Sequence, residues 1–258
     1  MQRKALNPIM LLVFILVLIS PSCATAQPMP TTTPKPTATI TVTSTRTPRP
    51  SSTPKPTRTP NRTATQQIEE RNAETQKYFE MGYLKMNDGK LIELADFKEE
   101  WAQLGWYWRW TYDAYQVSDF YMSGHFKWSS AYRSADLSGC GFVFAEQENG
   151  NHYAVFLDKS KILFAQTEYY YYPIGTTRGT GRVKFGNPFD QPDEADFALI
   201  VKDAYAYVLV NGEAVGEYTL SQSKNLRGKV GLSLLSGTNK DYGTRCEITN
   251  LHLWIPRK

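Results

Sequence analysis

Short segments rich in β-branched and aromatic residues follow one another from residue 119 to the end of the chain, each bounded by Gly, Asn, Asp or Pro. β-Branched and aromatic residues suit the pleated surface of a sheet, and Gly, Asn, Asp and Pro suit turns. The segments read DFYMSGHFKW, GCGFVFAEQ, HYAVFLDK, KILFAQTEYYYY, DFALIVKD, AYAYVLV, EAVGEYTL, GKVGLSLLSG and TRCEITNLHLWI. Many short strands at this spacing predict an all-β sandwich or barrel.

The sharpest local signal is YVLVNGEAVGEY. Asn211 and Gly212 suit the two positive-φ positions of a type I′ turn, so the sequence predicts a hairpin between strands near 204–210 and 213–219.

A family resemblance lies in the strings DFALIVKDAYAYVLVNGEAVGEYTL, GKVGLSLLSG and CEITNLHLW. They resemble the C-terminal half of a concanavalin A-like jelly roll, the superfamily of laminin-G domains, legume-type lectins, family-16-type glucanases and the 3-keto-disaccharide hydrolase domain. The last of these is the most similar, and DFKEEWAQLGWYWRW and GCGFVFAEQENGNHYAVFL extend the resemblance upstream. The resemblance implies a two-sheet antiparallel jelly-roll sandwich over residues 85–258.

Residues 1–26 have the features of an export signal. Arg3 and Lys4 precede the apolar run IMLLVFILVLI, which is shorter than the roughly 20 residues of a membrane span. Two processing sites remain open. SPSC ends at Cys23 and resembles a lipobox, although Ser20 replaces the usual Leu, and ATA would allow cleavage after Ala26. We expect an exported protein, either secreted or attached to the membrane by lipid at Cys23.

Residues 27–65 are dominated by Thr and Pro, with nine of the 15 prolines lying between Pro28 and Pro60. Such a segment has too few apolar residues to form a core, so we expect a disordered, extended stalk. A lead-in helix is expected over residues 66–84, which lack Gly and Pro until Gly82. A lipobox-like signal, a Thr/Pro-rich stalk and a jelly roll together resemble surface proteins of filamentous bacteria such as the Chloroflexi.

Charge is distributed unevenly along the chain. Residues 1–65 contain eight of the 29 basic residues and no acidic residue, so residues 66–258 carry 21 basic and 25 acidic residues. The folded part is therefore acidic and shows no clustered basic patch, which argues against a nucleic acid partner.

Cys140 and Cys246 are the only cysteines left after either processing reaction. Exported proteins meet an oxidising compartment, so we expect a disulfide between them, with two buried free thiols as the alternative.

Catalytic and metal-binding patterns are missing. EADFAL places Glu194 and Asp196 on one strand face but has Leu199 where a glucanase E-x-D-x-x-E motif needs its third acid. Glu146 and Glu148 are two residues apart, and we interpret them as a solvated strand end. The three His residues, His125, His152 and His252, lie on separate segments without the spacing of metal ligands. The candidate oxygen ligands for calcium, Asp136, Asp158 and Asp241, are also scattered. We therefore expect no cofactor, with calcium as the alternative.

The string GWYWRWTYDAYQ raises the question of which strand face meets solvent. Alternation places Trp106, Trp108 and Trp110 on one face and Tyr107 and Arg109 on the other. Three indoles are a large apolar area, so we expect the Trp face, above all Trp106 and Trp108, to pack in the core. Tyr107 and Arg109 would then face a ligand.

EYYYYPIG supplies a second aromatic cluster, from which Tyr170 and Tyr172 are the pair predicted to join that ligand face. Tyr rings stack on sugars and also decorate sheets without any ligand. We therefore predict a non-catalytic recognition module for a glycan or a cell-surface partner. A glycoside hydrolase related to the 3-keto-disaccharide hydrolases and a purely structural envelope protein are the alternatives.

Overall fold

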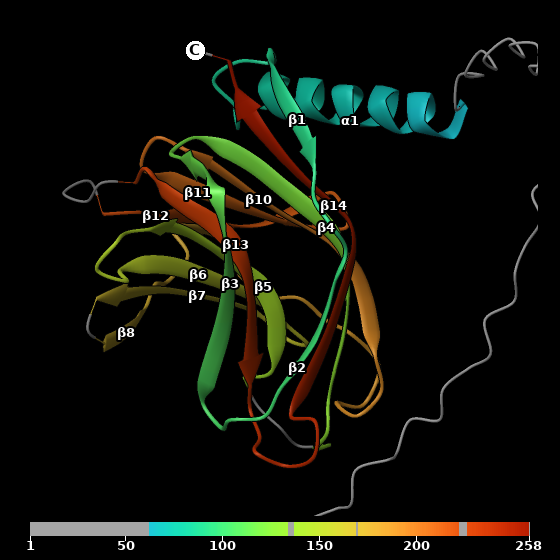
Figure 1. The fold of residues 1–258 in the computed structure, drawn as a ribbon, viewed down its shortest axis with the longest axis vertical. Coiled ribbons are helices and arrows are strands. Elements are labelled where there is room, and N and C mark those ends of the chain that lie inside the picture. The colour runs from blue at the N-terminus through green and yellow to red at the C-terminus, as the bar shows by residue number, and fades with distance from the viewer. Residues whose placement is uncertain (1–61, 134–136, 169, 222–225, 258) are drawn as a thin grey trace, which may run out of the picture. The chain divides into compact units, whose positions relative to one another are not determined.

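The computed structural model describes residues 62–133, 137–168, 170–221 and 226–257 (Figure 1). The predicted signal, Cys23 and the predicted stalk lie outside the described residues, except for the last four residues of the stalk, which begin α1 (Arg62–Glu80). Fourteen strands follow: β1 (Gly89–Glu93), β2 (Phe97–Trp101), β3 (Trp106–Val117), β4 (Phe120–Ser130), β5 (Gly139–Glu146), β6 (His152–Asp158), β7 (Ile162–Glu168), β8 (Tyr170–Pro173), β9 (Arg178–Gly179), β10 (Asp193–Lys202), β11 (Tyr205–Val210), β12 (Glu213–Thr219), β13 (Gly228–Ser236) and β14 (Thr244–Pro256).

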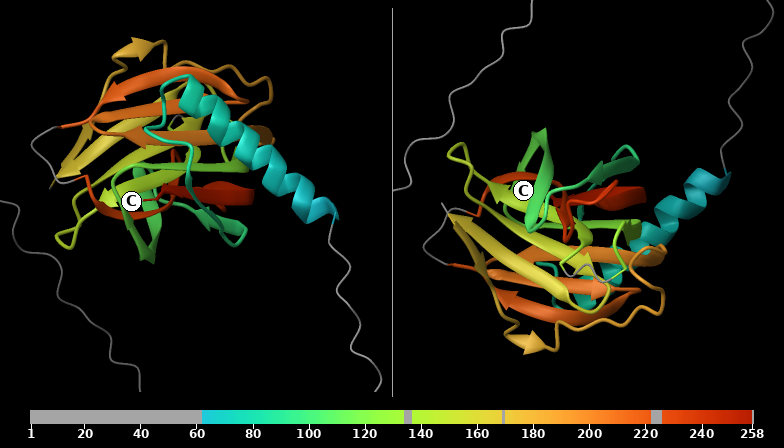
Figure 2. Two further views of the ribbon diagram at one scale, coloured as in Figure 1. Left: turned by 90° about the horizontal axis from the view of Figure 1, so that it is seen from above. Right: turned by 90° about the horizontal axis from the view of Figure 1, so that it is seen from below.

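The strands form two antiparallel sheets that pack face to face (Figures 1 and 2). The eight-stranded sheet has the order β1-β14-β4-β10-β11-β12-β9, with β2 also paired to β14. The six-stranded sheet has the order β3-β13-β5-β6-β7-β8. The predicted all-β fold, a two-sheet antiparallel jelly-roll sandwich, is confirmed.

The core lies between the sheets and consists largely of rings from alternate strand positions. Phe142 of β5 stacks on Phe197 of β10 with ring centroids 5.2 Å apart, and Phe126 of β4 contacts both rings edge-on. All three side chains are fully buried. Every second side chain in the strands of both sheets therefore points into the space between the sheets, where these side chains form one core.

Helix α1 packs on the outer side of the eight-stranded sheet. Tyr78 of the helix contacts Tyr121 edge-on at 5.2 Å, and Trp254 belongs to the same buried cluster. The helix spans 62–80 rather than the expected 66–84. It ends at Glu80 because Gly82 adopts φ 77° and the amides of Gly82 and Tyr83 donate back to the carbonyls of Phe79 and Tyr78. This is a Schellman C-cap, which ends a helix. Within the part of the chain that the structure describes, no helix is long and apolar enough to cross a membrane.

Two local predictions concern residues that the structure describes directly. Asn211 and Gly212 have φ of 51° and 77°, and they join β11 to β12, so the predicted type I′ hairpin is confirmed. The predicted disulfide is also confirmed: Cys140 of β5 and Cys246 of β14 are bonded, with Cα atoms 5.9 Å apart. Because β5 and β14 belong to different sheets, the bond ties the two halves of the sandwich together.

Candidate functional site

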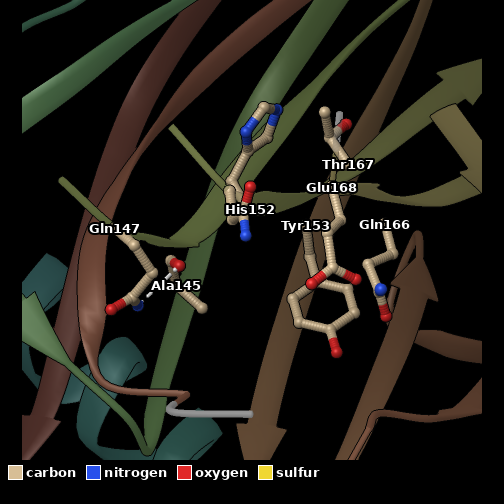
Figure 3. A pocket seen from close by; sticks show the side chains of 8 residues that line it. Ala145, Gln147, His152, Tyr153, Gln166, Thr167 and Glu168 are labelled. Carbon is tan, nitrogen blue, oxygen red and sulfur yellow. Dashed lines mark hydrogen bonds between the residues drawn. The ribbon is translucent and has the colours of Figure 1, made fainter. Parts of the chain in front are cut away.

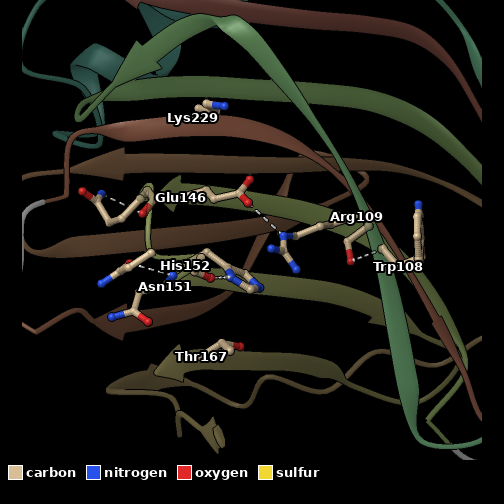
Figure 4. Close-up of polar contacts among 12 residues, drawn as sticks. Trp108, Arg109, Glu146, Asn151, His152, Thr167 and Lys229 are labelled. Atoms are coloured by element: carbon tan, nitrogen blue, oxygen red, sulfur yellow. Dashed lines mark hydrogen bonds and ion pairs between the residues drawn. The ribbon is translucent and has the colours of Figure 1, made fainter. Parts of the chain in front are cut away.

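The face of the six-stranded sheet that points away from the eight-stranded sheet is called here the outer face. It brings together side chains from five strands, namely Tyr107, Arg109, Glu146, His152, Thr167 and Tyr171. Figure 4 shows four of them, Arg109, Glu146, His152 and Thr167. Only Tyr107 and Arg109 of this group were predicted as site residues.

Strand β3 places Tyr107 and Arg109 on the outer face by simple alternation. They pair with Leu235 and Ser233 of β13 in the sheet register. The Tyr107 ring lies over Phe156 with centroids 5.4 Å apart, and Phe156 belongs to a fully buried apolar cluster beneath this face. The prediction that Tyr107 and Arg109 share a face is correct. Packing against this apolar cluster holds the Tyr107 ring in place.

A directed chain of hydrogen bonds fixes Tyr107. His152 Nδ1 lies 2.7 Å from the carbonyl oxygen of Gly150, so this nitrogen carries the proton and donates. His152 Nε2 is then an acceptor in the neutral ring, and the Tyr107 hydroxyl, at 2.6 Å, donates to it. The Tyr107 oxygen in turn accepts from the Thr167 hydroxyl at 2.8 Å. The three side chains hold one another in a single orientation.

Burial sets the electrostatics of this group. His152 is 3% exposed, and burial lowers its pKa, with a smaller lowering from the nearby Arg109 guanidinium. Burial also raises the pKa of Tyr107, partly offset by the hydrogen bond from Thr167. Both side chains are therefore neutral at pH 7. His152 is paired with Thr167 of β7, and the Tyr107 ring lies against its ring with centroids 5.7 Å apart.

The lowered pKa of His152 makes a testable contribution to stability. The unfolded chain protonates His152 below pH about 6.5, the ordinary pKa of His, whereas the folded chain keeps it neutral to lower pH. The free energy of unfolding therefore decreases as the pH falls through this range. We expect wild type to lose stability relative to His152→Gln between pH 7.5 and 5.5. The pKa of His252 is also lowered by burial, but this residue is present in both proteins and its effect cancels. Urea unfolding at several pH values measures the difference, and a difference that does not change with pH would contradict the assignment.

Glu146 reaches the outer face through a β-bulge. Ala145 has φ 53°, and the pairing of β13 with β5 shifts register between Lys229 and Gly231. The inserted residue turns Glu146 to the side of Arg109, where Glu146 Oε1 accepts from Arg109 Nε at 3.0 Å. The other carboxylate oxygen, Oε2, is buried and has no hydrogen-bond partner among the described residues. Glu146 is thus 14% exposed in its side chain, not the solvated strand end that we expected.

The second predicted aromatic pair is arranged differently from the prediction. Thr167 pairs with Tyr171, whose ring lies 6.5 Å from the Tyr107 ring and is 44% exposed, so Tyr171 is the tyrosine of β8 on the outer face. Tyr172 pairs with Gln166 and alternates to the opposite face. The side chain of Tyr170 lies outside the described residues. The sheet register, which the sequence does not show, decides which tyrosine of this run joins the site.

A pocket of about 130 Å³ lies at one end of β5, β6 and β7 and is lined by residues from both faces of the sheet (Figure 3). Figure 3 shows His152 and Thr167 on one side of these strands and Tyr153 and Gln166 on the other, as alternation requires. Asn151 and Gln147 also line it. The Asn151 side chain supplies an amide donor and an acceptor at this end of the strands.

The tryptophans contradict the sequence prediction. Trp106 and Trp108, expected in the core, are 63% and 48% exposed, and of this row Trp110 is the one that packs against the main core. Trp106, Trp108 and Trp110 do lie on the face of β3 that points toward the eight-stranded sheet. Because β3 is the end strand of its sheet, the interior at this corner is open, and the first two rings extend beyond it.

The acids of EADFAL lie far from this face in the fold. Glu194 and Asp196 share the outer side of the eight-stranded sheet, where Glu194 contacts Lys127 and Asp196 contacts His125. The hydrogen bond from Lys127 lowers the pKa of Glu194. These pairs are exposed to solvent on neighbouring strands. Leu199 occupies the position where the glucanase motif has its third acid, and it is fully buried.

No cluster of three or more His, Cys, Asp or Glu side chains that could hold a metal occurs among the described residues. Of the acids named as calcium ligands, Asp136 lies outside the described residues. Asp158 accepts from the amide and the hydroxyl of Ser160, both at 3.0 Å. Burial raises the pKa of Asp158, and its local bonds make it a turn-forming residue.

No protein-family model matches this chain, and no curated protein matches it. Solved structures do. A carbohydrate-binding module from Bacillus subtilis is 12% identical with a TM-score of 0.44, and the match covers 65% of this chain and 97% of that one. A Bacillus subtilis protein of unknown function with a galectin-like fold is 11% identical over 66% of this chain and 89% of its own, with a TM-score of 0.44.

A fructosyltransferase from A. japonicus is 14% identical over 66% of this chain, with a TM-score of 0.43, and the match spans only 27% of its length. At such identities and TM-scores these likenesses concern the β-sandwich and carry no argument about function.

Proposed function

We propose that the protein is a non-catalytic recognition module that binds a glycan on the outer face of the six-stranded sheet. One observation carries the proposal: this face combines a partly exposed Tyr171 ring with polar groups that are already held in place. The ring offers an apolar surface for one face of a sugar, and the polar groups offer donors and acceptors for its hydroxyls.

Arg109 and Glu146 supply the fixed polar groups. The Arg109 side chain is 39% exposed and uses Nε for Glu146, so its terminal nitrogens remain as donors directed over the turn at Gly150. Glu146 Oε2 is an acceptor that lacks a partner within the described chain. Because that oxygen is inaccessible to solvent, Glu146 contributes to the site by holding Arg109 through Oε1.

The same geometry favours binding over catalysis. His152, the strongest general base by residue type, is 3% exposed and uses both ring nitrogens in hydrogen bonds inside the protein. A base must reach the proton that it removes. His152 therefore serves to position Tyr107.

The location of the protein forms part of the proposal. The signal, with lipid at Cys23 or cleavage after Ala26, would export the chain, and the Thr/Pro-rich stalk of residues 27–65 would hold the sandwich away from the membrane. The concanavalin A-like resemblance agrees with an extracellular glycan partner. The mass of the N-terminal peptide of native protein tests the export, because an intact Met1 would contradict it.

Binding by variants of the full chain tests the site. A glycan array identifies a ligand, and calorimetry then compares Tyr171→Ala, Arg109→Ala and a control, Tyr205→Ala, which removes an exposed ring from the other sheet. Loss of one stacking ring should weaken binding about 2- to 12-fold, and loss of the charged donor should weaken it at least tenfold.

The control should bind like wild type, and melting temperatures verify that each variant folds. Equal affinity of all variants would place the ligand elsewhere. Release of reducing sugar ends from the ligand would instead indicate the hydrolase alternative.

A further inference from the structure

Trp106 and Trp108 form an exposed indole row, called here the Trp ledge, on the β3 face opposite Tyr107 and Arg109. Both are at least 48% exposed, and alternate positions on a strand lie about 6.6 to 6.8 Å apart. Single exposed apolar residues are common, but two adjacent indoles with Leu104, 61% exposed, in the preceding turn form an apolar patch.

Neighbouring rings hold Trp108 of the ledge in place. Trp101 of β2 contacts the Trp108 ring at 5.0 Å, and Trp110 lies 6.2 Å from it. Phe97 of β2 packs edge-on against Trp110 at 4.8 Å. Since β2 and β3 belong to different sheets, these contacts join the two sheets next to the open corner, and none of them involves Trp106. Packing between the sheets therefore accounts for Trp101, Trp108 and Trp110, and the described residues show no ring contact for Trp106.

The ledge is continuous with the outer face around a free sheet edge. β3 is the end strand of its sheet and has β13 as its neighbour. Tyr107 lies between Trp106 and Trp108 in sequence and points to the opposite side, so only the width of one strand separates the two surfaces. A polymer that lies on the outer face and crosses β3 would meet the indoles next.

We propose that the Trp ledge is an extended subsite that binds further sugar units of the same glycan chain, so that the protein recognises polysaccharides rather than short oligosaccharides. The inference rests on the proposed function of the outer face. Rings at alternate positions of a strand present flat apolar surfaces to successive sugars, and the packing of Trp108 against Trp101 fixes one of these rings before binding, which reduces the entropy lost on binding.

Chain length is the variable that tests this inference. The full-length protein is titrated with laminarin, xylan, levan and hydroxyethyl cellulose, and with a trisaccharide of each polymer. Trp106→Ala and Trp108→Ala should weaken binding of the recognised polysaccharide about 2- to 12-fold and leave trisaccharide binding within twofold of wild type. Trp106→Phe, which keeps a ring, should recover most of the affinity, and Tyr171→Ala should weaken both ligands.

Each other outcome overturns the inference in a distinguishable way. If Tyr171→Ala weakens binding and the Trp variants do not, the ledge fails while the outer face remains the site. If no glycan of the array and none of these probes binds to wild type, both proposals fail. If sedimentation shows a wild-type dimer that Trp106→Ala converts to a monomer, the ledge is a contact between two copies of the chain.

Discussion

Replacing Asp193 with alanine should lower the free energy of unfolding by about 3 to 5 kcal/mol, because it leaves a buried ammonium group without its counter-charge. Lys159 Nζ lies 2.5 Å from Asp193 Oδ2, and the two side chains are 5% and 7% exposed. The same nitrogen also donates to the carbonyl oxygens of Pro188 and Gln191, both at 2.8 Å. The pair thus holds the loop that leads into β10 against the end of β6.

Chemical denaturation of Asp193→Ala, of Lys159→Met and of the double variant Lys159→Met/Asp193→Leu measures this contribution. The double variant removes both charges and should be much more stable than Asp193→Ala, since apolar replacement of a buried pair is often close to neutral. A loss below 1 kcal/mol in Asp193→Ala would show that water reaches Lys159 and that the pair is not a buried one.

Loss of the disulfide should have a comparable effect. Cys140 and Cys246 are 106 residues apart, and a cross-link that closes a loop of this length contributes about 4 to 5 kcal/mol by restricting the unfolded chain. The variant Cys140→Ala/Cys246→Ala should therefore lose at least this much, because both sulfurs are also fully buried and their removal leaves space in the core.

Thermal and urea unfolding of protein folded under oxidising conditions provide the measurement. Titration of the unfolded, unreduced wild type should find no reactive thiol from this pair. Two thiols, or a double variant as stable as wild type, would contradict the disulfide in the native protein.

Local patterns in the sequence were sufficient for much of the fold. The hairpin at Asn211 and Gly212 depends on the backbone preferences of two adjacent residues, and the shared face of Tyr107 and Arg109 depends on their spacing alone. The Cys140–Cys246 bond followed from the number of cysteines. None of these features requires knowledge of which strands are neighbours.

Features that depend on sheet order could not be predicted in this way. Alternation shows that Trp106 and Trp108 share a face, but whether that face is covered depends on the position of β3 at the end of its sheet. The large apolar area of the two indoles led us to expect them in the core. Both are exposed because they lie at the open corner of the sandwich beside β3.

The missed site residues have a similar explanation. A β-bulge at Ala145 changes the alternation of β5 and brings Glu146 beside Arg109. A positive φ at a non-glycine residue in a strand leaves no mark in the sequence. Tyr171 and His152 join the face through strand pairing, which the sequence does not show.

Mapping the ligand by NMR tests the central proposal, glycan binding on the outer face, most directly. Isotope-labelled protein is titrated with the glycan that binds most strongly on the array, and backbone amide shifts are followed. We predict that the largest changes occur at Tyr107, Arg109, Glu146, Asn151 and Tyr171. Changes confined to the charged ladder around Lys127 and Glu194 on the eight-stranded sheet, or no changes at saturating ligand, would contradict it.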